Sequence, residues 1–235
     1  MTATPATETS ETPEPSGADG AYEHTDRTVP TRSRDRARYD RETVHAILDE
    51  AYVCHLGFVR DGAPVVLPTL FARVGEALYM HGSTGSRPLL AAGRTDPGLP
   101  VCVTVTHVDG LVLARSAFHH SLNYRSVVVH GTARQVTDEQ ERRTALDAMV
   151  DAVAPGRAAD VRPANARELA ATAVIRVDLE EVSAKLRTGP VNDDAEDLAL
   201  PHWAGVVPVT TTYGTPLPDA DLAPGTAVPG YLAAL

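Results

Sequence analysis

The sequence predicts a mainly β domain with flanking helices, of the α+β class, in which six or seven antiparallel strands close into a small barrel. Runs of alternating apolar and polar residues follow one another along the chain, and this alternation is typical of half-buried strands. Asp-Gly pairs beginning at Asp61 and Asp109 separate consecutive runs, as tight hairpins do. The chain lacks the strand–helix alternation of a parallel sheet, and closing a barrel hides the edges of antiparallel strands.

The first expected element is a helix that Asp40 caps and whose apolar side chains recur at helical spacing from Val44 to Ala51. The expected strands then cover residues 52–59, 63–73, 77–82, 101–108, 111–117, 124–136 and 173–182. Gly131 interrupts the longest of these strands and is expected to form a bulge there.

Three more helices are expected between and after the strands. A short one over residues 87–92 starts near Pro88 and ends before Gly93. A longer one follows a capping box formed by Thr137 and Gln140 and carries an apolar stripe that includes Met149 and Val153. The last lies around residues 165–171.

Composition divides the 235 residues into three parts. Residues 1–38 have hardly any large apolar side chain, and we expect them to be disordered because they cannot bury enough surface to offset the entropy of ordering. Residues 39–189 are expected to form the folded domain. Residues 190–235 form a proline-rich extension whose first part is expected to pack on the barrel or on a partner subunit.

Charge and targeting signals narrow the classes of partner. The net charge of −10 argues against a nucleic-acid-binding protein, because the average field repels phosphate. No apolar run reaches the length of a signal peptide core or of a membrane span. Cys54 and Cys102 lack a Cys-x-x-Cys arrangement, which favours reduced thiols and a cytoplasmic location.

The segment from Tyr79 to Arg87 has the composition of a phosphate-binding turn. Gly82 and a second glycine let backbone N–H groups approach an anion closely, while Ser83 and Ser86 add hydroxyl donors. Arg87 adds a planar cationic fork where the short helix begins. No Lys-Ser/Thr pair follows, which excludes a nucleotide-triphosphate loop.

Two strands carry residues suited to a ligand. Pro68 lies in the middle of a strand, and since proline cannot donate to a sheet it marks either an edge protected from aggregation or a ligand contact. Arg125 and Ser126 open an otherwise apolar strand, as polar side chains at a cleft rim or at an ordinary strand start do.

Nine histidines are present, yet their spacing does not predict a metal site. His119 and His120 are adjacent, so on a strand they point to opposite faces. His81 is the exception to follow, because it lies at the mouth of the phosphate-binding turn and is the candidate catalytic residue.

Four segments together resemble the pyridoxamine 5′-phosphate oxidase-like, FMN-binding split-barrel proteins, especially the flavin-nucleotide-binding branch akin to nitroimidazole-resistance (Nim) reductases. They are residues 66–69, residues 79–87, residues 125–131 (similar to an Arg-Gln-Val-x-x-x-Gly strand) and the Pro-His-Trp-Ala-Gly segment at 201–205.

The resemblance implies a split-barrel homodimer that binds FMN without a covalent bond, in the groove between its two subunits. Leu67, Pro68 and Thr69 would line the flavin ring, and Ser126 and Trp203 would contact it. His81, Gly82, Ser83, Ser86 and Arg87 would surround the phosphate. The implied activity is NAD(P)H-linked reduction of a small acceptor such as a nitroaromatic or a quinone.

The chain also departs from the oxidases, because it lacks their Glu-Phe-Trp-Gln-Gly segment and the Arg-Leu-His that follows it. This argues against vitamin B6 oxidation. Three alternatives remain open: a haem-binding split barrel with His81, His119 or His120 as axial ligand, a deazaflavin (F420) reductase, and a flavin carrier or sensor without turnover.

Overall fold

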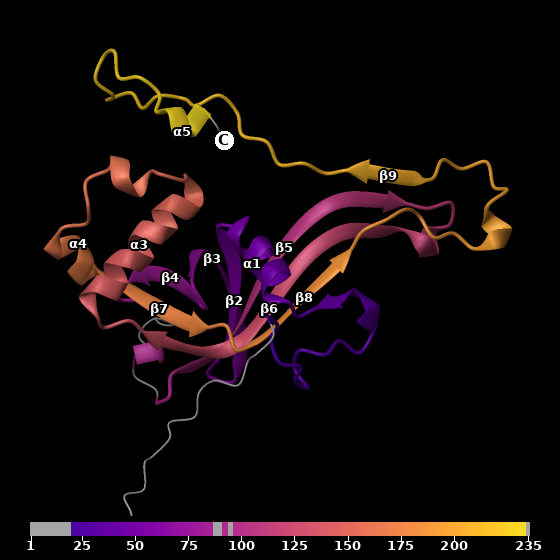
Figure 1. Ribbon diagram of the computed structural model, residues 1–235, viewed down its shortest axis with the longest axis horizontal. Coiled ribbons are helices and arrows are strands. Elements are labelled where there is room, and N and C mark those ends of the chain that lie inside the picture. The colour runs from indigo at the N-terminus through magenta and orange to yellow at the C-terminus, as the bar shows by residue number, and fades with distance from the viewer. Residues whose placement is uncertain (1–19, 87–90, 94–95, 234–235) are drawn as a thin grey trace, which may run out of the picture.

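The computed structural model describes residues 20–86, 91–93 and 96–233. Six antiparallel strands pair in a closed ring in the order β2, β3, β4, β7, β6, β5, which confirms the expected α+β split barrel (Figure 1). β8 and β1 extend the sheet from β6, and β9 pairs with β5. The strands are β1 (Ala37–Arg38), β2 (Val53–Arg60), β3 (Ala63–Val74), β4 (Ala77–Ser83), β5 (Leu99–Leu113), β6 (Ser121–Gln135), β7 (Thr172–Asp178), β8 (Glu181–Arg187) and β9 (Gly205–Pro208).

The α-helices that lie wholly within the described residues are α1 (Arg41–Asp49), α3 (Glu139–Val153), α4 (Ala166–Ala171) and α5 (Gly230–Ala233). Short 3-10 helices are η1 (Arg34–Arg36), η2 (Ala117–His119), η3 (Ala158–Asp160) and η4 (Ala195–Asp197). Residues 91–93 are helical, whereas most of the helix expected over 87–92 lies outside the described residues. None of the helices in the described ranges is both long and apolar enough to cross a bilayer.

Side-chain alternation along the strands divides the apolar residues into two clusters. One fills the barrel and is closed at one end by Ile47 and Leu48 of α1. The other lies outside the barrel, between the β3–β4–β7 face and α3, and includes Tyr79 and Met149. The barrel is therefore packed inside, and the space available for a ligand lies on its outer surface.

Helix capping follows the sequence closely, with one shift. Asp40 accepts a hydrogen bond from the Thr43 N–H at 2.8 Å, as expected. At α3 the cap is Asp138, which accepts from the Glu141 N–H at 2.8 Å, so the expected capping box at Thr137 is wrong by one residue. An aspartate at this position also interacts favourably with the positive end of the helix dipole.

The two Asp-Gly pairs have different conformations. Asp61 and Gly62 both have positive φ, 51° and 77°, as a two-residue hairpin turn requires. The second expected hairpin is wrong: Asp109 and Gly110 lie inside the continuous strand β5, where the pairing with β6 shifts register. A Cβ on Gly110 would lie 3.0 Å from Val206 Cγ1, so this glycine admits the neighbouring strand β9.

Two further expectations about strands are corrected. The predicted strand over residues 173–182 is split into β7 and β8 by a turn, in which the Leu179 N–H donates to the Glu76 carbonyl at 2.9 Å. Gly131 pairs in regular register with Val101 and forms no bulge. A Cβ at Gly131 would lie 2.9 Å from Val177 Cγ1, so glycine is needed for close approach inside the barrel.

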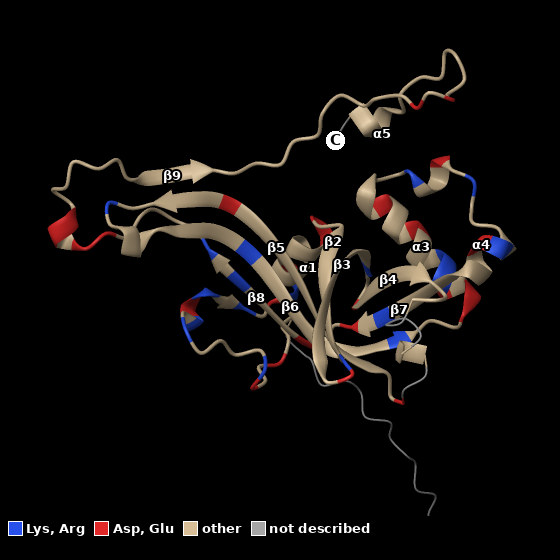
Figure 2. Cartoon of the chain, turned by 180° about the vertical axis from the view of Figure 1, so that it is seen from behind, with Lys and Arg blue, Asp and Glu red and all other residues tan. Residues whose placement is uncertain are grey.

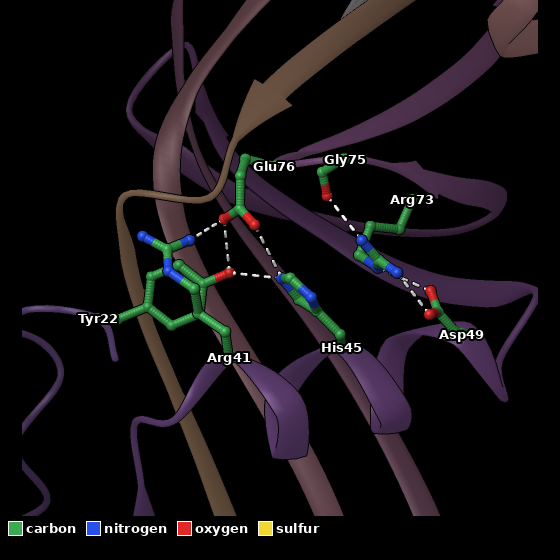
Figure 3. A network of polar contacts seen from close by, with 7 residues as sticks. All are labelled: Tyr22, Arg41, His45, Asp49, Arg73, Gly75 and Glu76. Atoms are coloured by element: carbon green, nitrogen blue, oxygen red, sulfur yellow. Dashed lines mark hydrogen bonds and ion pairs between the residues drawn. The ribbon is translucent and has the colours of Figure 1, made fainter. Parts of the chain in front are cut away.

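Part of the N-terminal segment expected to be disordered belongs to the fold. The ring of Tyr22 is buried in the barrel cluster, and its hydroxyl donates to Glu76 Oε2 at 3.0 Å and lies 2.9 Å from His45 Nε2 (Figure 3). Arg41 lies over the same ring and pairs with Glu76. Tyr22, the pairing of β1 with β8 and the hydrogen bond from Lys185 Nζ to the Arg32 carbonyl thus attach residues 20–38 to the barrel, although their low overall apolar content suggested disorder.

Candidate cofactor-binding site

β4 positions the residue that the sequence analysis singled out. Leu78 and Met80 point into the barrel, whereas Tyr79 faces α3 on the outside. By the two-residue period of a strand, His81 lies on the same outer face as Tyr79. The C-terminal end of β4 therefore presents the imidazole of His81 to the space between the barrel and α3.

That space is a cavity of about 800 Å³, within the range of roughly 300–1,000 Å³ typical of small-molecule sites. Most of its wall is apolar and comes from α3, from the loop between α3 and α4, and from strand ends. Its lining residues are Leu70, His81, Leu146, Asp147, Met149, Val150, Val153, Ala154, Arg157, Ala158, Val161, Arg162, Pro163, Ala164, Glu168, Thr172 and Leu232.

The environment of His81 defines its protonation and its tautomer. Burial lowers its pKa, so the imidazole is neutral at pH 7. Nδ1 lies 3.0 Å from Met149 Sδ, and because a thioether can only accept, Nδ1 carries the proton. The Nε2 lone pair is then available, and a neutral imidazole in this tautomer is a common metal ligand.

The charged groups of the cavity wall are two arginines, Arg157 and Arg162, and two acidic residues, Asp147 and Glu168. Arg157 Nη1 lies 3.4 Å from Asp160 Oδ2, and Arg162 Nη2 lies 2.7 Å from Glu168 Oε1. Both guanidinium groups are more than a third exposed, so these ion pairs are weak and can exchange for a ligand carboxylate. The cavity thus suits a large apolar ligand, and the two arginines could bind its anionic substituents by exchanging their present carboxylate partners.

The turn predicted to bind phosphate uses its backbone donors internally. The N–H groups of Gly85 and Ser86 donate to the side chain and the carbonyl of Ser83, at 3.2 and 2.8 Å. The Thr84 N–H donates to the Ala171 carbonyl at 3.1 Å. A phosphate here would depend on side-chain hydroxyls and on Arg87, which lies outside the described residues.

The β3 segment carrying Leu67, Pro68 and Thr69 is exposed along one edge. Residues 63–70 pair with β2, while pairing with β4 begins at Phe71, so within the described chain the other edge of this segment has no strand beside it. Pro68 and Leu70 share one face of the strand, and Leu70 reaches the cavity that holds His81. A planar ligand could lie along this edge.

The remaining predicted contacts lie elsewhere in the chain. The Ser126 hydroxyl donates to the Lys185 carbonyl at 3.2 Å and lines a separate cavity of about 210 Å³ against residues 27–30. Trp203 is 66% exposed and lies two residues before β9, a strand that Figure 1 shows far from β4. One chain therefore does not bring Ser126 and Trp203 to the β3 edge or to His81.

The other histidines offered as axial ligands are already bonded at the end of the β5–β6 hairpin. His119 Nε2 lies 3.0 Å from Asp194 Oδ2, and His120 Nδ1 lies 3.0 Å from the Ser116 carbonyl. In the described ranges, His119 with Asp194 and Asp197 forms the group whose geometry could hold an ion; Asp194 is exposed and the other two are half-buried. Neither histidine lines the large cavity.

The sequence predicts the apolar stripe of α3 but does not predict that part of this stripe lines a cavity. Met149 is buried, but Val150 and Val153 are 37% and 43% exposed. Their apolar side chains at helical spacing on a face that the barrel does not cover were the available signal.

Comparison with solved structures finds many similar chains, two of which share 41% of their residues with this one. The flavocytochrome Anf3 from Azotobacter vinelandii is 41% identical, with a TM-score of 0.82 over 89% of this chain and 96% of that one. An FAD and haem binding protein from Mycobacterium smegmatis is also 41% identical, with a TM-score of 0.79 over 85% of this chain and 96% of that one. A candidate 5-nitroimidazole antibiotic resistance protein from Bacteroides thetaiotaomicron shares the fold, at 21% identity and a TM-score of 0.51 over 63% and 85% of the two chains.

No curated protein matches the chain. The family model described as pyridoxamine 5′-phosphate oxidase matches residues 40–186, which include the whole barrel ring and most of β8. With more than half of its length matched and its strands closed in the expected ring, the chain belongs to the pyridoxamine 5′-phosphate oxidase family.

Proposed function

We propose that this protein is a redox protein that binds both a flavin and a haem. The observation that carries the proposal is His81, a neutral imidazole whose Nε2 has no hydrogen-bond partner among the described residues, in the wall of a largely apolar cavity of about 800 Å³. Support comes from the two chains at 41% identity, one named a flavocytochrome and the other an FAD and haem binding protein.

The cavity fits a haem better than it fits a flavin phosphate. Its walls are largely aliphatic, His81 Nε2 would bind the iron, and Arg157 and Arg162 would bind the carboxylates. Met149 Sδ would hold the His81 ring through its Nδ1–H, in the way that outer partners orient metal-bound histidines. When bound, the haem would supply one-electron chemistry.

The flavin would lie along the open edge of β3. Leu67, Pro68 and Thr69 would contact the ring edge, and the unpaired backbone there offers donors for negative charge on a reduced flavin. Ser83, Ser86 and Arg87 would bind the phosphate. We propose FMN because the chain resembles FMN-binding proteins; the M. smegmatis protein is named for FAD, so the bound flavin has to be identified directly.

A homodimer would complete this site. Ser126 and Trp203 lie away from the β3 edge of their own chain, so a second copy would have to supply them. Residues 198–218 contain no Asp, Glu, Lys or Arg, and Figure 2 shows this uncharged stretch alongside the β5–β6 hairpin. Exposed apolar side chains there fit a protein interface; they include Val108, Leu111, Leu122, Trp203 and Val207.

The proposal also names an electron donor for the flavin and a final electron acceptor. NAD(P)H would reduce the flavin from the open cleft, because the sequence carries no dinucleotide fingerprint for a stably bound nicotinamide. A small acceptor such as a quinone or a nitroaromatic would then receive the electrons. The residues named above would bind the cofactors and provide their electrostatic environment, whereas the cofactors would carry out the redox chemistry.

The first experiment is the absorption spectrum of the purified full-length protein, before and after addition of hemin and flavin. The proposal predicts both a Soret band and flavin bands. His81→Ala should remove the Soret band and retain the flavin, whereas His119→Ala and His120→Ala, as matched controls, should retain both. If the Soret band survives in His81→Ala but disappears in a control variant, the assignment of His81 is wrong. The haem ligand would then be the histidine changed in that control, at the end of the β5–β6 hairpin.

Further measurements separate the alternatives. Chromatography of the extracted flavin distinguishes FMN, FAD and a deazaflavin. Anaerobic addition of NADH or NADPH should bleach the flavin, and a bound flavin that neither donor reduces would favour a carrier or sensor. Light scattering should give the mass of a dimer, and a monomer that binds flavin at full affinity would contradict the shared site.

A further inference from the structure

The C-terminal end of the chain returns to the cavity after a long exposed excursion. Beyond β9, residues 209–228 are exposed throughout, and we call them the strap. Figure 1 shows the strap passing over the barrel and ending in α5, above the end of α3. Burial resumes at Pro229, Tyr231 and Leu232. The end of the chain therefore has a specific docking place, although the strap leading to it has few contacts.

Tyr231 anchors α5 to the loop after α3. Its hydroxyl donates to Asp160 Oδ2 at 2.6 Å and accepts from Arg157 Nη1 at 2.8 Å. Its ring lies against Gly156, where an added Cβ would be 3.9 Å from Cδ1. Arg157 and Asp160 also face each other at 3.4 Å, so the three polar groups form a closed set.

The neighbouring residue, Leu232, contributes directly to the cavity. It lines the same space as His81, Met149 and Val153, although it comes from the opposite end of the domain in sequence. Leu232 is thus the part of the wall that a movement of the strap could remove. Arg157 lines the cavity and also donates to Tyr231. The docking of α5 is therefore coupled to the position of a positive charge in the cavity wall.

We propose that α5 is a lid on the His81 cavity, with Leu232 completing the wall and Tyr231 as the positioning residue that holds the lid shut. This inference concerns access to the site described under the proposed function and rests on that function for the identity of the ligand. The strap tethers α5 to the rest of the chain, which keeps α5 at an effective concentration of about millimolar near its docking place, so a single anchor suffices to keep the lid mostly closed.

The test compares ligand exchange in Tyr231→Phe and Leu232→Ala with the wild-type protein and with Leu217→Ala. Leu217 lies on the strap and is 90% exposed, so its substitution changes the strap without changing the lid. Hemin loss from the loaded protein to excess apomyoglobin should be about tenfold faster in Tyr231→Phe. The Soret maximum should not move, because the His81 ligand is intact. Leu217→Ala should match the wild type.

A second probe separates failure of the lid from failure of the proposed function. If the wild-type protein takes up no hemin, the haem assignment fails, and the same variants are compared by stopped-flow binding of 1-anilinonaphthalene-8-sulfonate. The lid then predicts faster dye entry in Tyr231→Phe and Leu232→Ala. Rates within twofold of the wild type with the probe that binds, or no dye binding by any of the proteins, would overturn the lid. An Asp160→Ala variant should be no faster when combined with Tyr231→Phe, because both changes break one anchor.

Discussion

The docking of residues 20–38 on the barrel makes a quantitative prediction through Tyr22. The ring is 4% exposed and packs in the main cluster, so Tyr22→Ala should lower the free energy of unfolding by about 3–5 kcal/mol, as for other buried aromatic residues. Tyr22→Phe keeps the ring and removes a hydrogen bond to a carboxylate. Such a bond contributes roughly 1.5–3 kcal/mol when buried. Because Glu76 is 49% exposed, water replaces part of it, and we expect about 1 kcal/mol.

Equilibrium urea unfolding of the full-length protein, followed by circular dichroism, measures both variants. Phe118→Ala is the matched control, since that aromatic ring is 89% exposed and its removal should change stability by less than about 0.5 kcal/mol. If Tyr22→Ala costs no more than Phe118→Ala, the segment contributes nothing to the fold, and the sequence-based expectation of disorder was right. Equal losses in Tyr22→Ala and Tyr22→Phe would instead assign the stabilisation to the hydroxyl alone.

Two other predictions follow from packing and from protonation. Gly131→Ala should destabilise the protein by about 1–3 kcal/mol, because its methyl group would collide with Val177; thermal unfolding that shows no loss would contradict the close approach. Burial and the nearby Arg73 lower the pKa of His45, so the folded state keeps it neutral while the unfolded chain protonates it near pH 6.5. Stability should therefore fall as the pH drops from about 6.5 through the lower folded pKa, and His45→Gln should flatten that part of the profile. An unchanged slope in urea titrations of His45→Gln would refute the assignment.

Local signals in the sequence predicted most elements, and the failures have a common cause. Asp61-Gly62 and Asp109-Gly110 have the same residues, yet one pair forms a hairpin turn and the other lies within a strand. The difference comes from partners far away in sequence, since β6 and β9 hold β5 extended through Gly110 on both sides. The two rows of backbone hydrogen bonds override the turn propensity of the Asp-Gly pair. The local sequence does not show that these two partner strands will be present.

The candidate site likewise combines residues that local sequence signals identify with residues that only the tertiary fold brings together. His81 was identified from its place beside a glycine-rich turn, but the cavity next to it is formed by α3 and by Leu232, which only the tertiary fold brings to β4. Conversely, Ser126 and Trp203 were assigned to one site by resemblance, and a single chain places them apart. The resemblance describes an assembled protein, whereas periodicity and capping describe one polypeptide.

The ring of strands is not equally strong all the way round. β5 and β6 pair along almost their entire lengths, but β6 and β7 meet through two residue pairs, Arg134 with Arg176 and Gln135 with Ile175. We therefore expect the barrel to breathe at this narrow seam, with the amides of residues 134–136 exchanging with deuterium sooner than those in the middle of β5.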